Sequence, residues 1–144
     1  MRRALRAARA AGARGEVPVG AVAVRDGAVL ASAGNAIERR GDATAHAELL
    51  VLRRVAGIVG GWRLDGVTVY ATLEPCPMCA GAMVQSRIAS CVYAARDPKK
   101  GADGSVYEVL RNPRNNHRIE VVHGVGAIEA AQLLQDFFRA RRGA

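Results

Sequence analysis

The chain lacks long apolar runs and has few aromatic residues. Of its 144 residues, 50% are hydrophobic but only 4% are aromatic, which indicates a compact core of Val, Leu, Ile and Ala. No run approaches the roughly 20 apolar residues of a membrane helix. The Arg-rich start has neither the apolar segment nor the cleavage site of a secretory signal. We therefore expect no membrane partner.

Cysteine is also scarce, and its odd number argues against a disulfide framework. Two of the three cysteines form the motif Cys76-x-x-Cys79. Unpaired cysteines of this kind are typical of reducing compartments. The cysteine pattern therefore predicts a cytoplasmic protein.

Acidic residues are few, 13 against 21 Lys and Arg, and the formal net charge is +8. Such an excess favours a polyanionic partner, because phosphate contacts release counterions and steer association. Lys99 and Lys100 are the only lysines, however, and a GC-rich gene would produce the same abundance of Arg, Ala and Gly. Charge alone therefore leaves nucleic-acid binding open.

The first part of the chain predicts a helix followed by a β-hairpin. Met1 to Ala13 interleaves arginines with Ala and Leu, as an amphipathic helix does. Val19–Arg25 and Ala28–Gly34 are short apolar runs joined by Asp26-Gly27. Asp-Gly supplies the positive φ angles of a two-residue turn, so these strands should be antiparallel.

The remainder alternates helices with strands. We expect helices at His46–Ala56, Met78–Arg87 and Ala127–Arg142, and strands at Val67–Thr72, Ala89–Ala95 and Ile119–His123. In the last helix the spacing predicts a buried stripe of Ile128, Ala131, Leu134 and Phe138. This order implies one domain over residues 1–144 with an α/β fold, three layers (α/β/α) around a mixed five-stranded central sheet.

The most informative pattern is His46-Ala47-Glu48 followed, one strand later, by Pro75-Cys76-Pro77-Met78-Cys79. One imidazole and two thiolates make a three-ligand zinc site that leaves the fourth tetrahedral position for water. Cys76 and Cys79 open a helix three residues apart, so both can face one point, and the helix dipole there favours thiolate. His46 begins the preceding helix, so two helix starts would converge on the metal.

Glu48 is the candidate catalytic carboxylate. About 200° of helical rotation separates it from His46, which makes it a poor ligand but allows it to lie beside the bound water. Zinc lowers the pKa of such water to about 7. Glu48 would take its proton and pass protons to the substrate and the leaving group, a transfer that typically contributes ~10²–10⁴ in rate.

Each part of the pattern also has an ordinary interpretation. His-x-Glu alone is usually a plain helix start, and Cys-x-x-Cys alone occurs in redox motifs and in closed structural zinc sites. A closed site needs a fourth ligand, for which Cys91, His117 and His123 are the candidates. We expect Cys91 to pack as a small hydrophobic residue and His123 to lie at the surface. Both motifs together, each opening a helix, are typical of zinc nucleobase deaminases.

Beyond this signature, the chain resembles the bacterial tRNA-specific adenosine deaminases of the cytidine deaminase superfamily over nearly its whole length. The matching stretches are Glu16–Ala21, Asn35, Thr44–Glu48, Thr72–Met83, Ser86–Ile88, Ala95–Asp97, Gly101–Ser105, Asn116–Arg118 and Phe137–Arg139. The zinc motif alone indicates only a deaminase, whereas the later stretches separate this family from deaminases of free cytidine or guanine. Pro98-Lys99-Lys100 and the Arg-rich termini depart from the family pattern.

The resemblance implies a hydrolase that converts the wobble adenosine of an arginine tRNA to inosine. It further implies one zinc ion per subunit, no organic cofactor, and a homodimer with the active site near the subunit interface. The partner would be the tRNA anticodon stem-loop. Because that loop is single-stranded, flipping one base out costs less than opening a duplex.

The resemblance also assigns substrate contacts. Asn35 would hydrogen-bond the purine with the backbone of Ala47 nearby, and the loop that carries Asp97 and Lys99 would hold a neighbouring nucleotide. Alternatively, Asn35 is a turn residue, and Asp97 pairs with Arg96 or Lys99. The arginines of the last helix would meet the tRNA backbone or merely complement the helix dipole; they are Arg139, Arg141 and Arg142.

Two other functions stay open. A deaminase of free guanine, cytosine or nucleosides would share the zinc chemistry but would not need the basic surface that Lys99, Lys100 and Asn116–Arg118 provide. A non-enzymatic RNA-binding module with structural zinc would lose nothing when Glu48 is replaced, because it would have no activity to lose.

Overall fold

The computed structural model describes residues 1–143 and shows a five-stranded sheet. The strands are β1 (Gly20–Arg25), β2 (Ala28–Gly34), β3 (Thr68–Leu73), β4 (Ser90–Ala95) and β5 (Glu120–His123). They lie in the order β2-β1-β3-β4-β5. β1 is antiparallel to β2 and β3, and β4 is parallel to β3 and β5. The predicted mixed five-stranded sheet is confirmed.

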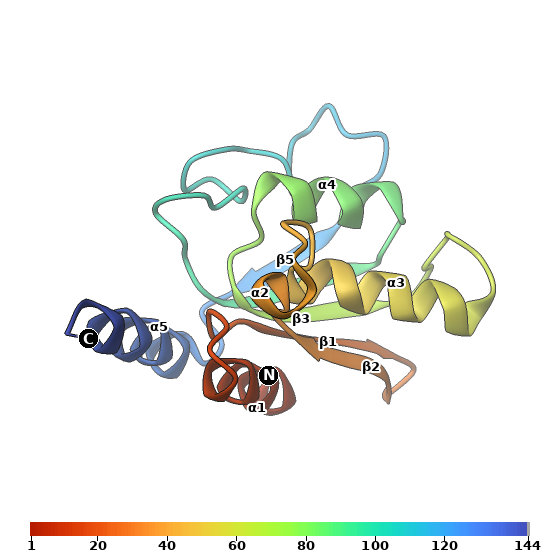
Figure 1. Ribbon diagram of the computed structural model, residues 1–144. Helices are drawn as coiled ribbons and strands as arrows, with labels where there is room; N and C mark the ends of the chain where they lie inside the picture. Colours follow the sequence, from red (N-terminus) through yellow and green to blue (C-terminus); the bar gives the residue numbers. More distant parts are fainter. Residues whose placement is uncertain (144) are drawn as a thin grey trace.

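Helices cover both faces of this sheet. They are α1 (Arg2–Ala13), α2 (Ile37–Arg40), α3 (Ala47–Val59), α4 (Pro77–Gln85) and α5 (Ala127–Arg142). α1 and α5 lie together on one face, and α3 and α4 lie on the other (Figure 1). The three predicted layers are therefore confirmed. Within residues 1–143, no helix has both the length and the apolar composition needed to cross a membrane.

The hairpin turns where the sequence predicts it. Asp26 and Gly27 have φ angles of 52° and 76°, the left-handed conformation that a two-residue hairpin turn requires. α1 then lies directly against this hairpin, because Ala4 and Ala8 on its inner face are fully buried and a Cβ at Gly20 would overlap their backbone. Small residues on both sides thus make α1 an integral layer of the fold.

Two connections differ from the prediction. The stretch Asn35–Thr44 contains the short helix α2, which its polar composition did not indicate. The crossover from β4 to β5, residues 96–119, is a loop without a helix in the described chain, although parallel neighbours are usually joined by one. That loop is held by the buried carboxylate of Asp103 and by Leu110 and Ile119, which are buried in the core.

The buried stripe predicted for α5 is only partly observed, since Ala131 and Leu134 are partly buried against the core but Ile128 and Phe138 are not. Ile128 is 88% exposed and Phe138 is 43% exposed, whereas Ala130 is buried. α5 rests on β4, β3 and α1 through Ala130, with Ala131 and Leu133 partly buried beside it. Because these neighbours cover only one narrow side of the helix, Ile128 and Phe138 stay exposed.

Candidate active site

The three predicted metal ligands lie together at two helix starts. His46 is the N-cap of α3, Cys76 is the N-cap of α4, and Cys79 lies in the first turn of α4. The Nδ1 atom of His46 is 3.6 Å from Sγ of Cys76 and 3.5 Å from Sγ of Cys79. These three side chains form a group that could hold one metal ion.

The spacing of this group suits tetrahedral zinc. With a Zn–S bond of about 2.3 Å and a Zn–N bond of about 2.0–2.1 Å, tetrahedral geometry places a nitrogen and a sulfur ligand about 3.5 Å apart. The two distances from His46 agree with that value. Pro77 occupies the first turn of α4, where its missing N–H is not required, and α4 can therefore begin directly at Cys76. The donor set and its geometry both fit zinc.

The pKa values of the two thiols of the group are shifted in opposite directions. A hydrogen bond with Cys79 and the nearby His46 lower the pKa of Cys76 to about 4, although burial opposes the shift. The same hydrogen bond, together with burial, raises the pKa of Cys79. Since thiolate is the form that binds metal, a divalent cation would displace the remaining thiol proton on binding.

None of the three candidate fourth ligands joins the group. Cys91 is fully buried in β4, as expected for a small hydrophobic residue. His117 lies with Nε2 2.7 Å from the carbonyl oxygen of Ile88, and His123 stacks on Tyr93 at the exposed surface. The site therefore has the three-ligand pattern of catalytic zinc centres instead of the four-ligand pattern of structural ones.

Glu48 is buried beside the three ligands. It is 4% exposed, and its Oε1 is a buried oxygen with no hydrogen-bond partner in the described chain. Burial raises the pKa of its carboxyl group, while a backbone hydrogen bond and His46 oppose the shift. An unpartnered buried acceptor costs about 1–3 kcal/mol. Such an atom indicates a place where a polar group from outside the protein is received.

Asn35 connects the end of the hairpin to the start of α3. Its Oδ1 accepts a hydrogen bond of 3.1 Å from the backbone N–H of Ala47, one of the N–H groups that a helix start leaves unpaired. Asn35 borders the same cavity as His46 and Glu48. Among residues 1–143 no acceptor is found for its amide nitrogen, so Nδ2 is available to a ligand.

Asp97, Lys99 and Lys100 border this cavity from the start of the β4–β5 loop. The Oδ1 of Asp97 accepts backbone N–H groups of Lys99 at 3.0 Å and Lys100 at 3.3 Å. In the described chain Asp97 forms no ion pair with Arg96 or Lys99, so the expected alternative of a side-chain pair is not observed. The carboxylate shapes the turn and leaves both lysine side chains exposed.

The cavity that these residues line has a volume of about 780 Å³, within the range of about 300–1,000 Å³ typical of ligand sites. α5 contributes part of its lining, namely Leu134, Gln135, Phe138, Arg139 and Arg142. Arg141 is turned elsewhere, donating to the carbonyl oxygen of Gly15 and lying over the ring of Phe137. Two of the three C-terminal arginines therefore face the site.

Sequence reasoning missed the contribution of α5 to this cavity. Leu134, Phe138 and Arg142 follow one another at a spacing of four residues, which puts them on one helix face. That spacing can be seen in the sequence. It indicates that this side of the helix faces inward, but it does not distinguish a packed core from the wall of a cavity. Glu74 also borders the cavity and was not singled out from the sequence, because nothing in its local pattern marks a carboxylate as buried.

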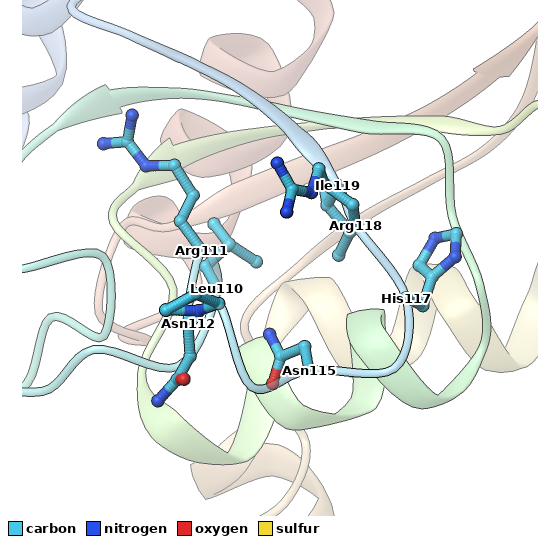
Figure 2. A pocket seen from close by; sticks show the side chains of 8 residues that line it. Leu110, Arg111, Asn112, Asn115, His117, Arg118 and Ile119 are labelled. Atoms are coloured by element: carbon cyan, nitrogen blue, oxygen red, sulfur yellow. The ribbon is translucent and has the colours of Figure 1, made fainter.

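A second, smaller hollow of about 210 Å³ lies within the β4–β5 loop. Figure 2 shows its lining side chains, which include Arg111, Asn115, His117 and Arg118. Of the residues considered as metal ligands only His117 lines it, and His117 does not belong to the group formed by His46, Cys76 and Cys79. The larger cavity, which His46, Cys76 and Glu48 line, is therefore the candidate active site.

Comparison with known proteins agrees with this geometry. The sequence profile of the MafB19-like deaminase family matches residues 1–142. The tRNA-specific adenosine deaminase of Bacillus subtilis is 46% identical over 142 residues, covering 99% of this chain and 88% of that protein. The corresponding protein of Agrobacterium fabrum is 45% identical, with coverage of 99% and 93%.

Solved structures give the same picture. A structure from a study of A-to-I editing by tRNA:A34 deaminases at the wobble position of transfer RNA superimposes with a TM-score of 0.89 at 45% identity. The match covers 93% of this chain and 97% of that one. A guanine deaminase from Nitrosomonas europaea is more distant, with a TM-score of 0.77 and 25% identity over 93% of this chain and 80% of that one.

Proposed function

This chain belongs to the MafB19-like deaminase family, and we propose that it deaminates the wobble adenosine of a tRNA anticodon to inosine. The main support for this proposal is that His46, Cys76 and Cys79 converge on one point, beside the Oε1 of Glu48, which has no hydrogen-bond partner in the described chain. Two relatives that match over 88% and 93% of their length are named tRNA-specific adenosine deaminases. We further propose an arginine tRNA as substrate, one zinc ion per subunit, and a cytoplasmic location.

The residues divide the work by position. His46, Cys76 and Cys79 would hold zinc, which when bound lowers the pKa of water to about 7 and so supplies a nucleophile at neutral pH. Glu48 accepts a first proton from the attacking water at Oε1 and delivers it to the ring nitrogen. It then takes the second proton from the same oxygen and passes it to the amino group, which leaves as ammonia. Because Glu48 is buried, its raised pKa suits a group that must both take up and release protons.

The cavity wall provides substrate recognition. Asn35 donates from Nδ2 to the purine ring, while its Oδ1 stays bonded to Ala47. Lys99 and Asp97 lie at the border, where nucleotides next to the flipped base pass. Arg139 and Arg142 face the same opening from α5 and supply charge for phosphates.

We also propose that the protein acts as a homodimer with the active site near the subunit interface. The support is the family resemblance, together with exposed apolar side chains at Met78 in α4 and at Val106 and Tyr107 in the β4–β5 loop. Interfaces between identical subunits bury side chains of this kind. Analytical ultracentrifugation of the zinc-loaded protein tests this point; a monomer at micromolar concentration would contradict it.

The main test compares substrates on one preparation. Zinc-loaded protein is incubated with an arginine tRNA anticodon stem-loop, free adenosine, guanine and cytosine, and products are separated by liquid chromatography. We expect inosine from the stem-loop, and no comparable turnover of the free bases or nucleoside. Comparable turnover of guanine would favour a free-base deaminase instead. Glu48→Ala should retain zinc and make no inosine, whereas an RNA-binding module would show no product from either protein.

A further inference from the structure

Glu74, the residue before Pro75 and Cys76, is 1% exposed yet has no part in the proposed chemistry. Its Oε1 accepts hydrogen bonds from the backbone N–H of Asp97 at 3.1 Å and from the hydroxyl of Ser105. Its Oε2 accepts the backbone N–H groups of Asp103 at 2.8 Å and Ser105 at 3.4 Å. One carboxylate thus binds both ends of the segment 97–105.

Gly101 allows the middle of that segment to close over the carboxylate. A Cβ at this position would lie within 2.5 Å of the carboxyl carbon and both oxygens of Glu74. Directly after it, the N–H of Ala102 donates to the carbonyl oxygen of Pro75 at 2.8 Å. The segment is therefore laid on residues 74 and 75 so closely that position 101 has no room for a side chain.

Asp103 fixes the same segment from its other side. It is 2% exposed and accepts two hydrogen bonds of 2.8 Å from Nε and a terminal nitrogen of Arg111. The hydroxyl of Tyr93 in β4 donates to it at 2.6 Å. Arg111 belongs to the second hollow (Figure 2), so this pair ties the segment to β4 and to the next part of the loop.

The Glu74 carboxylate is well suited to act as an anchor. Four donors from Asp97, Asp103 and Ser105 surround its two oxygens. Hydrogen bonds to an ionised acceptor are about twice as strong as those between neutral groups. Loops are otherwise the most mobile parts of a fold. Four such bonds therefore fix the position of the segment 97–105 relative to Glu74.

We propose that Glu74 is a positioning residue for substrate binding, which acts through the segment 97–105. It holds Asp97 and Lys99 at the border of the cavity, in the geometry that receives the nucleotides next to the target base. The proposal rests on the proposed function for the identity of the substrate. Because Glu74 is 1% exposed and both of its oxygens are bonded to the segment, its loss should affect substrate binding more than the chemical step.

Three variants test this role. Ser105→Ala removes one donor outside the cavity, Gly101→Ala pushes a methyl group into the carboxylate, and Glu74→Gln replaces an acceptor by a donor. We expect KM for the anticodon stem-loop to rise about tenfold in each, as one charge-assisted hydrogen bond is worth, with kcat changed less than about threefold. The matched control is Gly57→Ala in α3, where an added Cβ meets nothing within 4 Å.

Two readouts do not depend on turnover. Dissociation constants for a fluorescent stem-loop, measured in a Glu48→Ala background, should rise in parallel with KM. Hydrogen exchange of the peptide that covers residues 97–105 should accelerate in the three variants and stay unchanged in the control. Because the steric conflict in Gly101→Ala is with a carboxylate, shortening it in the double variant Gly101→Ala/Glu74→Asp should recover part of the lost affinity.

Several results would overturn the proposal. If exchange accelerates while KM and the dissociation constant stay at wild-type values, the network is merely structural. If zinc content falls, or kcat falls as much as kcat/KM, Glu74 acts on the Cys76 segment and not on the loop. If wild-type protein makes no inosine from the stem-loop, the proposed function fails, but the exchange experiment still decides whether Glu74 anchors the segment.

Discussion

The side-chain oxygen of Asn35 accepts the backbone N–H of Ala47 at 3.1 Å, which ties the end of the hairpin to the helix start that carries His46 and Glu48. The Oδ1 atom of this amide is therefore used within the protein, and we propose that its Nδ2 binds the substrate. The two purposes are separable, because different substitutions remove one or both of them.

For Asn35 we predict different effects on stability and on activity. Asn35→Ala leaves the buried N–H of Ala47 without its acceptor and should lower the free energy of unfolding by about 1–3 kcal/mol. Asn35→Asp keeps that acceptor but loses the donor, so it should be more stable than Asn35→Ala. Both variants should lose at least about tenfold in kcat/KM. Urea unfolding and inosine assays measure the two effects; full activity of Asn35→Asp would contradict purine recognition by Nδ2.

For Glu48 we predict that loss of activity comes without loss of stability. Glu48→Gln preserves the shape of the side chain and removes a buried charge whose Oε1 has no protein partner. The rate should fall by about 10²–10⁴, while the free energy of unfolding equals or exceeds that of wild type, because a buried, unpaired charge is costly. Chemical denaturation of both proteins at equal zinc content gives the comparison. A marked destabilisation would mean that Glu48 supports the fold.

The cysteines provide a matched test of the metal site. Cys76→Ala and Cys79→Ala should lose zinc and unfold at lower temperature, since metal binding is coupled to folding. Cys91→Ala removes a thiol that is as buried as that of Cys79 but lies outside the group, and it should keep one zinc ion per chain. Metal analysis and thermal unfolding, each with and without a chelator, distinguish the three. Zinc loss in Cys91→Ala would place the metal elsewhere.

The residues of the metal site were predictable because their signals are local. Cys76 and Cys79 are separated by one helical turn, with Pro77 at the helix start, and His46 and Glu48 lie at the start of the preceding helix. Two short stretches of neighbouring residues therefore contain the argument. The alternation of Val67, Val69 and Ala71 likewise predicts a strand with one buried face, as observed. Such patterns depend on helix and strand periodicity and not on distant contacts.

Features that depend on distant contacts were not predictable. The face that α5 buries is set by β4 and by α1, which begins 125 residues earlier in the chain, and apolar spacing alone assigned Phe138 to the core. The burial of Glu74 likewise depends on Ser105, 31 residues away. A carboxylate followed by Pro75 gives no local indication that four donors will surround it.

Tyr93 should make the fold sensitive to alkaline pH. Burial and the hydrogen bond to Asp103 raise the pKa of its phenol. In the unfolded chain the phenol ionises near its ordinary value of about 10, whereas in the folded protein it stays neutral. Its contribution to stability is therefore fully present below pH of about 10 and is lost as pH rises above that value. Urea unfolding at pH 8 and pH 11 should show a smaller decline in Tyr93→Phe than in wild type; equal declines would exclude this source.

The arginines of α5 should differ in their effect on RNA binding. Arg139 and Arg142 line the cavity, whereas Arg141 bonds to the carbonyl oxygen of Gly15 and covers Phe137. If the first two meet phosphates, Arg139→Gln and Arg142→Gln should each reduce the slope of log Kd against log salt concentration by about one. Arg141→Gln, which removes the same charge from the same helix, should leave that slope unchanged. Equal slopes in all three variants would mean that the arginines of α5 only balance its dipole, since a helix dipole attracts cations at its C-terminus whether or not RNA is bound.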